Sequence, residues 1–148
     1  MYIVSGCLLG ENCKYHGGNN NDEKVKTFLK DKKYIPVCPE VMAGFSTPRP
    51  PAEILDGRVL NNLGEDITEG FIRGAELMWQ AALKKSAEYG EEIEGAVLKA
   101  RSPSCGACRI YDGSFKGKII DGYGVAAEFL KKMGIKLMTE EDLQDDRL

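Results

Sequence analysis

The chain has 148 residues and a formal net charge of −3 from 20 basic and 23 acidic side chains. That length matches one ordinary domain, and the mixed charges form no basic face, which disfavours a role in coating nucleic acid. No stretch approaches the ~18 apolar residues of a membrane span, and the start lacks the charged and apolar regions of an export signal. We therefore expect one domain over residues 1–148 in the cytoplasm. Structural disulfides are rare there, and the five cysteines are better explained by metal binding or catalysis.

The first half of the chain alternates short apolar runs with one amphipathic segment. Tyr2–Ser5 is predicted as a buried strand, residues 22–33 as a helix with apolar positions at helical spacing, and Tyr34–Val37 as a second strand. Residues 52–55 and 58–60 flank an Asp-Gly dipeptide, which favours a tight hairpin turn. We predict a small β-hairpin there.

A long helix follows the predicted hairpin. Asp66 and Glu69 have the spacing of a capping box, and apolar positions at helical spacing continue until the helix ends near residues 89–90. Residues 95–99 then contain a compact apolar run that predicts a third buried strand.

The last predicted elements are a helix, a strand and a short helix. Residues 125–133 form a helix stopped by Gly134, residues 135–138 a fourth strand, and Thr139 begins a helix with Asp142 at the capping spacing. Compact apolar strands that alternate with helices favour a mostly parallel sheet covered on both faces. We therefore predict a single three-layer α/β domain, Rossmann-like, with a small β-hairpin insertion.

Three cysteines follow the predicted strands at their carboxyl ends. Cys7 comes two residues after the first strand, Cys38 directly after the second, and Cys105 in the loop after the third. In a parallel sheet these ends share one edge, where open α/β folds bind ligands, so the three thiols can converge on one point. Each could instead be a small buried apolar residue, but glycine, proline and serine surround all three, which favours a site.

The other two cysteines leave alternatives open. Cys13 is a fourth ligand, a spare thiol or a packing residue, whereas Cys105 and Cys108 form a C-x-x-C pair typical of redox or zinc sites. A non-catalytic zinc- or sulfur-binding module that uses Cys105 and Cys108 is therefore the alternative function. The single histidine and the lack of a second C-x-x-C do not fit the paired zinc patterns. A thiol-disulfide enzyme would leave Cys7 and Cys38 without a role.

Six motifs that together cover nearly the whole chain resemble one known bacterial family. They are SGCLLG at residues 5–10, CPEV at 38–41, TPRPPAEI at 47–54, LKARSPSCG at 98–106, YDGSF at 111–115 and GYGVAA at 122–127. The family is that of the TudS-type thiouracil desulfidases. The resemblance implies a [4Fe-4S] cluster held by three cysteines, matching Cys7, Cys38 and Cys105, with one iron left open.

The implied reaction takes sulfur from a thiolated pyrimidine, a small nucleobase or nucleoside of thiouracil or thiouridine type, and leaves the carbonyl base and sulfide. No net redox change is required. Thiolates hold iron-sulfur clusters, and an open iron is a thiophilic Lewis acid, so the cysteines suit this chemistry. Replacing C=S by C=O also requires an activated water and proton transfer, which calls for a carboxylate and a hydroxyl nearby.

Glu40, Ser102 and Ser104 are the catalytic candidates. Glu40 lies two residues from Cys38, and the serines lie three residues and one residue before Cys105. Glu40 is the candidate general acid/base, and the serines are candidates to orient substrate or water, with Ser102 favoured by its resemblance to the family's active-site serine. The alternatives are a solvated or helix-capping Glu40 and serines that bond their own loop.

Arg49, Lys99 and Arg101 are the candidate substrate contacts. Arg49 lies in a proline-stiffened loop, and Lys99 and Arg101 flank the serine motif. All three can hold a carbonyl or phosphate of the substrate, or can pair with Glu53 or surface acids instead. Tyr15 and Tyr111 are placed to stack on a pyrimidine ring, although packing is the commoner use of tyrosine and we assign them no role.

Overall fold

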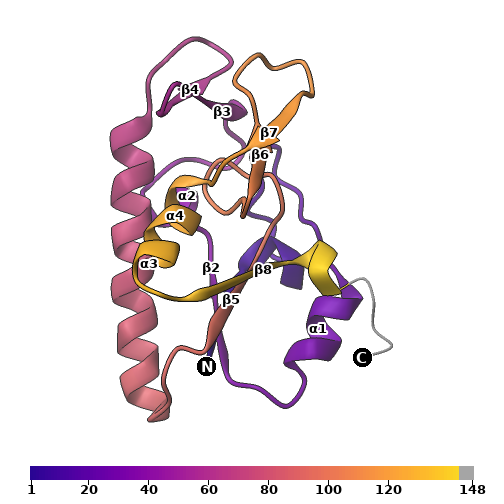
Figure 1. Cartoon of the computed structure of the whole chain (residues 1–148), viewed down its shortest axis with the longest axis vertical. Helices are drawn as coiled ribbons and strands as arrows, with labels where there is room; N and C mark the ends of the chain where they lie inside the picture. The colour runs from indigo at the N-terminus through magenta and orange to yellow at the C-terminus, as the bar shows by residue number, and fades with distance from the viewer. Residues whose placement is uncertain (144–148) are drawn as a thin grey trace.

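The described part of the chain, residues 1–143, is built around one parallel sheet of four short strands. In this computed structural model, β1 (Tyr2–Ser5) lies between β2 (Tyr34–Val37) and β5 (Gly95–Leu98), and β8 (Lys136–Thr139) pairs with the far side of β5 (Figure 1). All three strand pairs are parallel. The predicted α/β fold is confirmed, with each sheet strand within one residue of its predicted bounds.

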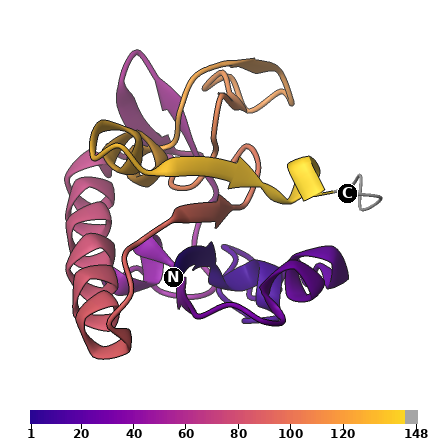
Figure 2. The same ribbon diagram turned by 60° about the horizontal axis from the view of Figure 1, so that its bottom comes forward.

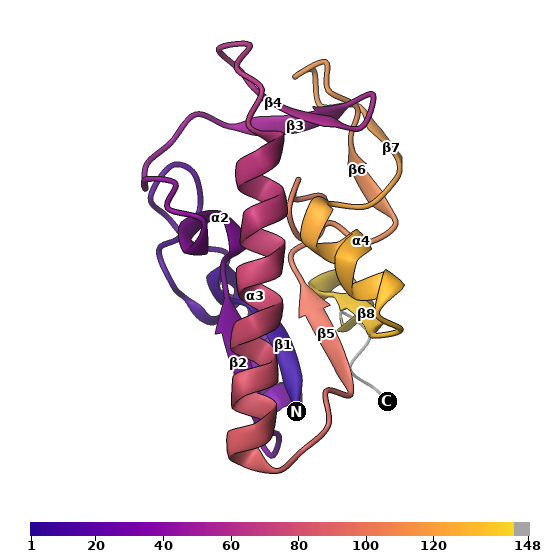
Figure 3. The same cartoon turned by 90° about the vertical axis from the view of Figure 1, so that its left-hand side faces the viewer.

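Helices cover both faces of this sheet. Because successive strand residues face opposite sides, Ile3 packs against α3 (Thr68–Tyr89) and α4 (Val125–Lys132), whereas Val4 packs against α1 (Glu23–Leu29). Figure 3 shows α3 and α4 side by side over one face, and Figure 2 shows α1 on the side of the sheet away from α3. The molecule therefore has the three predicted layers.

The predicted hairpin is present at the carboxyl end of the sheet. It consists of β3 (Ala52–Leu55) and β4 (Arg58–Asn61) in antiparallel register. Asp56 and Gly57 form the turn with φ values of 50° and 78°, the positive angles that a two-residue turn of this kind requires.

A second antiparallel hairpin lies beside the first and was not predicted. It pairs β6 (Arg109–Tyr111) with β7 (Ile119–Asp121). These strands have three residues each, and β7 is exposed throughout, so neither has the alternating apolar pattern that identifies a strand in a sequence. Figure 1 shows both hairpins standing above the sheet.

The start of α3 differs from the prediction. The helix begins at Thr68, and Asp66 accepts hydrogen bonds from the Thr68 amide at 3.0 Å and the Thr68 hydroxyl at 2.6 Å. The Thr68 oxygen in turn accepts from the Val59 amide at 2.8 Å. The predicted Asp66-Glu69 capping box is therefore wrong, because Asp66 serves to attach the first turn of α3 to β4.

The end of α1 differs from the prediction, whereas the start of the last short helix agrees with it. Helix α1 ends at Leu29, where the Lys32 amide bonds to the Leu29 carbonyl in a turn, so the predicted extension to residue 33 is wrong. The Thr139-Asp142 pair is confirmed: the Thr139 amide donates to the Asp142 carboxylate at 2.8 Å at the start of the 3-10 helix η2 (Glu140–Leu143). Over residues 1–143, no helix has both the length and the apolar character needed to cross a membrane.

Candidate active site

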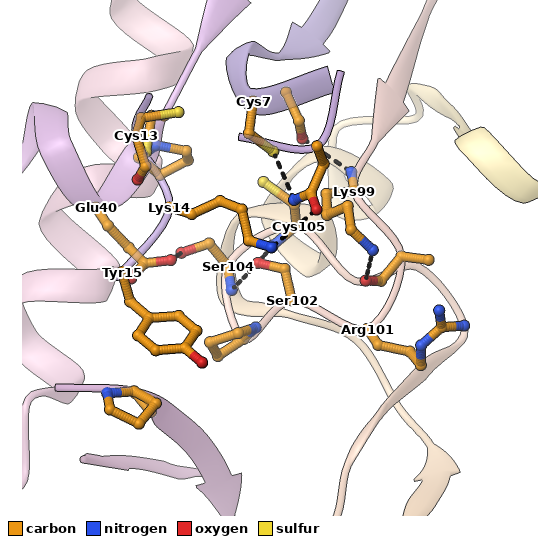
Figure 4. Close-up of a pocket in the computed structure, with 18 of the residues that line it drawn as sticks. Cys7, Cys13, Lys14, Tyr15, Glu40, Lys99, Arg101, Ser102, Ser104 and Cys105 are labelled. Carbon is orange, nitrogen blue, oxygen red and sulfur yellow. Dashed lines mark hydrogen bonds between the residues drawn. The ribbon is translucent and has the colours of Figure 1, made fainter. Parts of the chain in front are cut away.

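A cavity of about 450 Å³ opens at the carboxyl end of the parallel sheet. Its walls come from the loops after β1, β2 and β5 and from the two hairpins. All nine residues predicted as ligands, catalytic groups or substrate contacts line this cavity. In Figure 4, Glu40 and Tyr15 lie on one side of it, and Lys99 and Arg101 lie on the other.

The three predicted ligand cysteines come from three neighbouring strands. Cys7 lies in the 3-10 turn η1 (Gly6–Leu9) after β1, Cys38 joins β2 to the short helix α2 (Pro39–Met42), and Cys105 lies in the loop after β5. Because β2, β1 and β5 are adjacent in the sheet, their carboxyl ends bring the three thiols to one cavity. Cys7 and Cys105 are buried, and Cys38 is half-buried.

Cys13 supplies a fourth thiol to the same cavity. Its hydrogen bonds lower the pKa of Cys7 and lower that of Cys38 to about 7, while the same contacts raise the pKa of Cys13 itself. Since Cys13 carries a single S–H proton, it donates to one of these sulfur atoms at a time. The arrangement favours the thiolate form, which is the form that binds metals, at whichever of Cys7 and Cys38 accepts this proton.

The Cys105 thiol has a different environment. Burial raises its pKa, and a hydrogen bond with the Ser5 hydroxyl partly opposes this rise. The Ser5 oxygen also accepts from the Lys99 amide at 2.9 Å, which links the end of β1 to the end of β5. Cys105 is therefore held neutral in the absence of a positively charged ligand at its sulfur.

Asn20 and Lys14 reach the cavity from the long loop after η1. The Asn20 amide donates to the Cys7 sulfur at 3.4 Å, and the Lys14 ammonium donates to the Asn20 oxygen at 2.9 Å. Hydrogen bonds to a ligand sulfur tune the electronic properties of a thiolate-bound metal centre. Nothing in the sequence singled out these two residues, because an amide and a lysine in a loop carry no spacing signal.

Glu40 lies in α2, and both of its carboxylate oxygens have partners. Arg49 Nε donates to Oε1 at 3.0 Å, and Ser104 Oγ donates to Oε2 at 3.2 Å. The side chains of Arg49 and Glu40 are only 6% and 15% exposed, so the ion pair is shielded from water. Glu40 is therefore a fixed carboxylate in the cavity wall. Pro39 at the start of α2 and an acidic residue directly after it are typical of a helix N-terminus.

The two serines make opposite kinds of hydrogen bond. Ser102 Oγ accepts from the backbone amides of Ser104 at 3.1 Å and Cys105 at 3.0 Å, so it fixes its own loop. Ser104, buried to 2% exposure, donates to Glu40. Ser102 thus bonds its own loop, as the alternative interpretation of the serines expected. Ser104 is the serine whose hydroxyl contacts Glu40.

Helix α4 fixes the same loop from behind. The first amides of the helix donate to loop carbonyls, with Val125 bonding to Pro103 at 2.8 Å and Ala126 bonding to Ser104 at 2.8 Å. Gly124 permits this contact, because a Cβ at that position would lie 2.6 Å from the Ser104 carbonyl oxygen. The free amides at the helix start thus hold the serine-cysteine loop in place.

Lys99 and Arg101 line the cavity and also pair with acids near the chain end. Lys99 Nζ contacts Glu140 Oε2 at 2.9 Å and the Ala100 carbonyl at 3.0 Å, and Arg101 Nη1 contacts Glu141 Oε2 at 2.7 Å. Two of the three ammonium donors of Lys99 make these contacts. Both cations lie on the cavity wall opposite Glu40 (Figure 4).

The mouth of the cavity carries aromatic side chains. Tyr15 is 43% exposed and Phe115 is 38% exposed, and both line the cavity together with Tyr111. Phe115 is held by Glu53, whose Oε1 accepts from the amides of Gly113 at 3.0 Å and Phe115 at 3.1 Å. Phe115 was not singled out in the sequence because its position depends on the hairpin that was not predicted.

Cys108 lies outside this cavity. It is exposed, its sulfur is 3.3 Å from the Tyr123 hydroxyl, and it lines a smaller cavity of about 210 Å³ instead. Among residues 1–143, no three His, Cys, Asp or Glu side chains are grouped to hold a metal ion. The zinc alternative based on Cys105 and Cys108 therefore has no ligand set in the described structure.

The fold and the site define a class: an α/β protein with a cysteine-lined cavity at the carboxyl edge of a parallel sheet. The model of the 2-thiouracil desulfurase family matches residues 2–142. The chain belongs to this family, and the predicted family is confirmed. YbbK of Bacillus subtilis (strain 168), an uncharacterized protein, is 40% identical to this chain over an alignment of 157 positions, gaps included. The alignment covers 98% of this chain and 99% of YbbK.

A solved structure supports the same assignment. The [4Fe-4S]-dependent thiouracil desulfidase TudS matches with a TM-score of 0.82 and 39% sequence identity. The match covers 96% of this chain and 91% of that one. The three-layer arrangement described above is therefore shared with an enzyme that depends on an iron-sulfur cluster.

Proposed function

We propose that this protein removes sulfur from a thiolated pyrimidine of thiouracil or thiouridine type in a [4Fe-4S]-dependent, non-redox reaction. The observation that carries the proposal is the convergence of Cys7, Cys38 and Cys105 on one cavity from three neighbouring strands. In the overall reaction, C=S and water give C=O and hydrogen sulfide, so no electron donor is needed. Membership of the 2-thiouracil desulfurase family supports the substrate class.

Cys7, Cys38 and Cys105 are the proposed ligands of the cluster. Each thiolate of such a cluster binds a different iron atom, so the ligands stand farther apart than those around a single ion. Cys7, Cys38 and Cys105 line the same cavity, which is the arrangement such ligands need. When bound through three thiolates, the cluster supplies one open, thiophilic Lewis-acid position for the sulfur of the substrate.

Glu40 is the proposed general acid/base. Each of its oxygens accepts one hydrogen bond in the structure, and a carboxylate oxygen has a second lone pair that can accept a proton from water. Ser104 orients this carboxylate and can pass a proton to it. Ser102 retains a donor hydroxyl proton, because its two contacts use only its acceptor capacity, and it remains a candidate for orienting the substrate.

The proposed substrate site lies between the cations and the aromatic mouth. Lys99 and Arg101 can contact a carbonyl or phosphate oxygen from one wall, and Tyr15 and Phe115 offer ring faces that suit a flat base. We also propose a reducing, cytoplasmic setting, which the five free cysteines support.

Anaerobic purification followed by iron and sulfide analysis tests the proposed function. The protein should be brown, contain about four irons per chain, and release sulfide from thiouracil, thiouridine or its phosphate. Cys38→Ser should abolish colour and sulfide release, whereas Cys108→Ala, which changes an exposed thiol outside the cavity, should leave both unchanged. Cluster-loaded protein that releases no sulfide from any of the three compounds would refute the desulfidase function.

A further inference from the structure

The side chain of Arg49 is almost fully occupied by contacts within the protein. Nε donates to Glu40 Oε1 at 3.0 Å, Nη1 donates to the Ser46 carbonyl at 3.2 Å and the Thr47 hydroxyl at 3.0 Å, and Nη2 donates to the Cys13 carbonyl at 2.7 Å. A guanidinium has five N–H donors, so four of the five are committed. This count makes Arg49 poorly suited to the substrate contact predicted for it from the sequence.

The contacts of Arg49 join its own loop to two other parts of the cavity wall. Through Glu40 it reaches α2, and through the Cys13 carbonyl it reaches the loop after η1. Its own amide donates to the Tyr15 carbonyl, which ties the same loop a second time. The guanidinium is 6% exposed, so water does not compete for these hydrogen bonds.

The fork geometry of arginine explains why this residue type is required. The guanidinium presents Nε and Nη2 in one rigid plane, so binding to Glu40 and to the Cys13 carbonyl fixes their relative positions. Ser104 holds the other oxygen of Glu40, and the carboxylate is thereby fixed from both sides. Lysine at position 49 would keep the charge but could not hold both partners in this plane.

We infer that Arg49 is a positioning residue, which sets the orientation of the Glu40 carboxylate and links it to the Cys13 loop without contacting the substrate. This inference rests on the proposed desulfidase function and assigns to Arg49 a role in the catalytic step. Loss of the guanidinium should leave substrate binding intact and allow the carboxylate to rotate away from its reactive orientation.

The test compares Arg49→Gln and Arg49→Lys with the wild type as cluster-loaded holoenzymes. Arg49→Gln should lower kcat on the order of 10- to 100-fold with KM changed less than about twofold, because misplacement of a catalytic group affects only the chemical step. Arg49→Lys should recover part of kcat. The cluster absorbance of both variants should equal that of the wild type.

Arg58→Gln is the matched control, because Arg58 also pairs with a carboxylate, Asp66, but lies outside the cavity. It should leave kcat and KM unchanged. A rise in KM of Arg49→Gln at constant kcat would overturn the inference in favour of substrate contact. Loss of cluster absorbance in both Arg49 variants would overturn it in favour of a role in assembling the cluster site rather than in the chemical step.

A second measurement does not depend on turnover. If Arg49 orients Glu40, the falls in Tm caused by Arg49→Gln and Glu40→Gln should not add up in the double variant of the holoprotein. Additive falls in Tm would overturn the inference even if the protein releases no sulfide. Wild-type protein without sulfide release refutes the proposed function, whereas active wild type with an unimpaired Arg49→Gln variant refutes only the role of Arg49.

Discussion

Ser102 and Ser104 lie two residues apart and contribute to the site in different ways. Ser102 holds two backbone amides of the loop that carries Cys105, whereas Ser104 contacts the carboxylate of Glu40. Both serines were predicted as catalytic candidates with Ser102 favoured, and both line the cavity. Their hydrogen bonds show that Ser102 shapes the loop and that Ser104 contacts the proposed acid/base.

Ser104→Ala and Ser102→Ala should therefore fail in different ways. Ser104→Ala removes the donor to Glu40 and should lower kcat roughly 10-fold at normal cluster content. Ser102→Ala leaves two loop amides without their acceptor and should lower the free energy of unfolding by about 1–3 kcal/mol. Steady-state kinetics and denaturant unfolding of the two variants check this difference, and equal losses of kcat at unchanged stability would contradict it.

At the scale of elements, α2 lies between Cys38 and the long helix α3, so the packing of these helices positions Glu40. Gly74 of α3 makes the close approach possible, because a Cβ at this position would lie 2.2 Å from the Pro39 carbonyl oxygen. The predicted elements located α3 but not this contact, since a glycine within a helical pattern does not reveal what packs against it.

Asp66 joins the hairpin to the start of α3 and gives a prediction for pH dependence. Its pKa is lowered from 3.8 to about 2 by the Thr68 hydroxyl and Arg58. Because the pKa is lower in the folded state, the ionised carboxylate stabilises the protein above about pH 4, and this contribution is lost as the pH falls towards 2.

Asp66→Asn should lower the urea midpoint by roughly 0.1–0.5 M at pH 7, because the asparagine cannot form the charged pair with Arg58. The difference between wild type and variant should shrink below pH 4. Urea unfolding of both proteins between pH 3 and pH 7 measures this difference. A gap that stays constant over this range would show that the charge of Asp66 is not responsible.

At the scale of the whole molecule, the strands and long helices were predictable, whereas the cavity mouth was not. The apolar run at Tyr2–Ser5 identifies a buried strand because a parallel sheet covered on both faces needs one, whereas Tyr34–Val37 forms an edge strand in which only Ile35 and Val37 are buried. The β6–β7 hairpin lacks such a pattern, and the Arg49-Glu40 pair joins a loop residue to a residue of α2 that lies nine positions earlier in the chain. Tertiary packing alone determines these features.

Removal of the proposed cluster should affect the stability of the whole molecule. Cys7, Cys38 and Cys105 follow β1, β2 and β5, so a group bound to all three cross-links adjacent strands in the folded state only. Cluster-free wild type should melt about 10 °C or more below the loaded protein in anaerobic thermal unfolding. Cys38→Ser should show no such difference after the same reconstitution. Equal melting temperatures for loaded and cluster-free wild type would contradict the cross-link.

The attachment of α4 to the serine-cysteine loop has a consequence for the order of events during synthesis. Cys7 and Cys38 emerge from the ribosome early, but Cys105 comes late, and its loop is held by amides at the start of α4 (Val125–Lys132). A growing chain therefore contains two of the three proposed ligands long before the third is in place. Insertion of the proposed cluster is consequently expected only after the first turn of α4 has been synthesised.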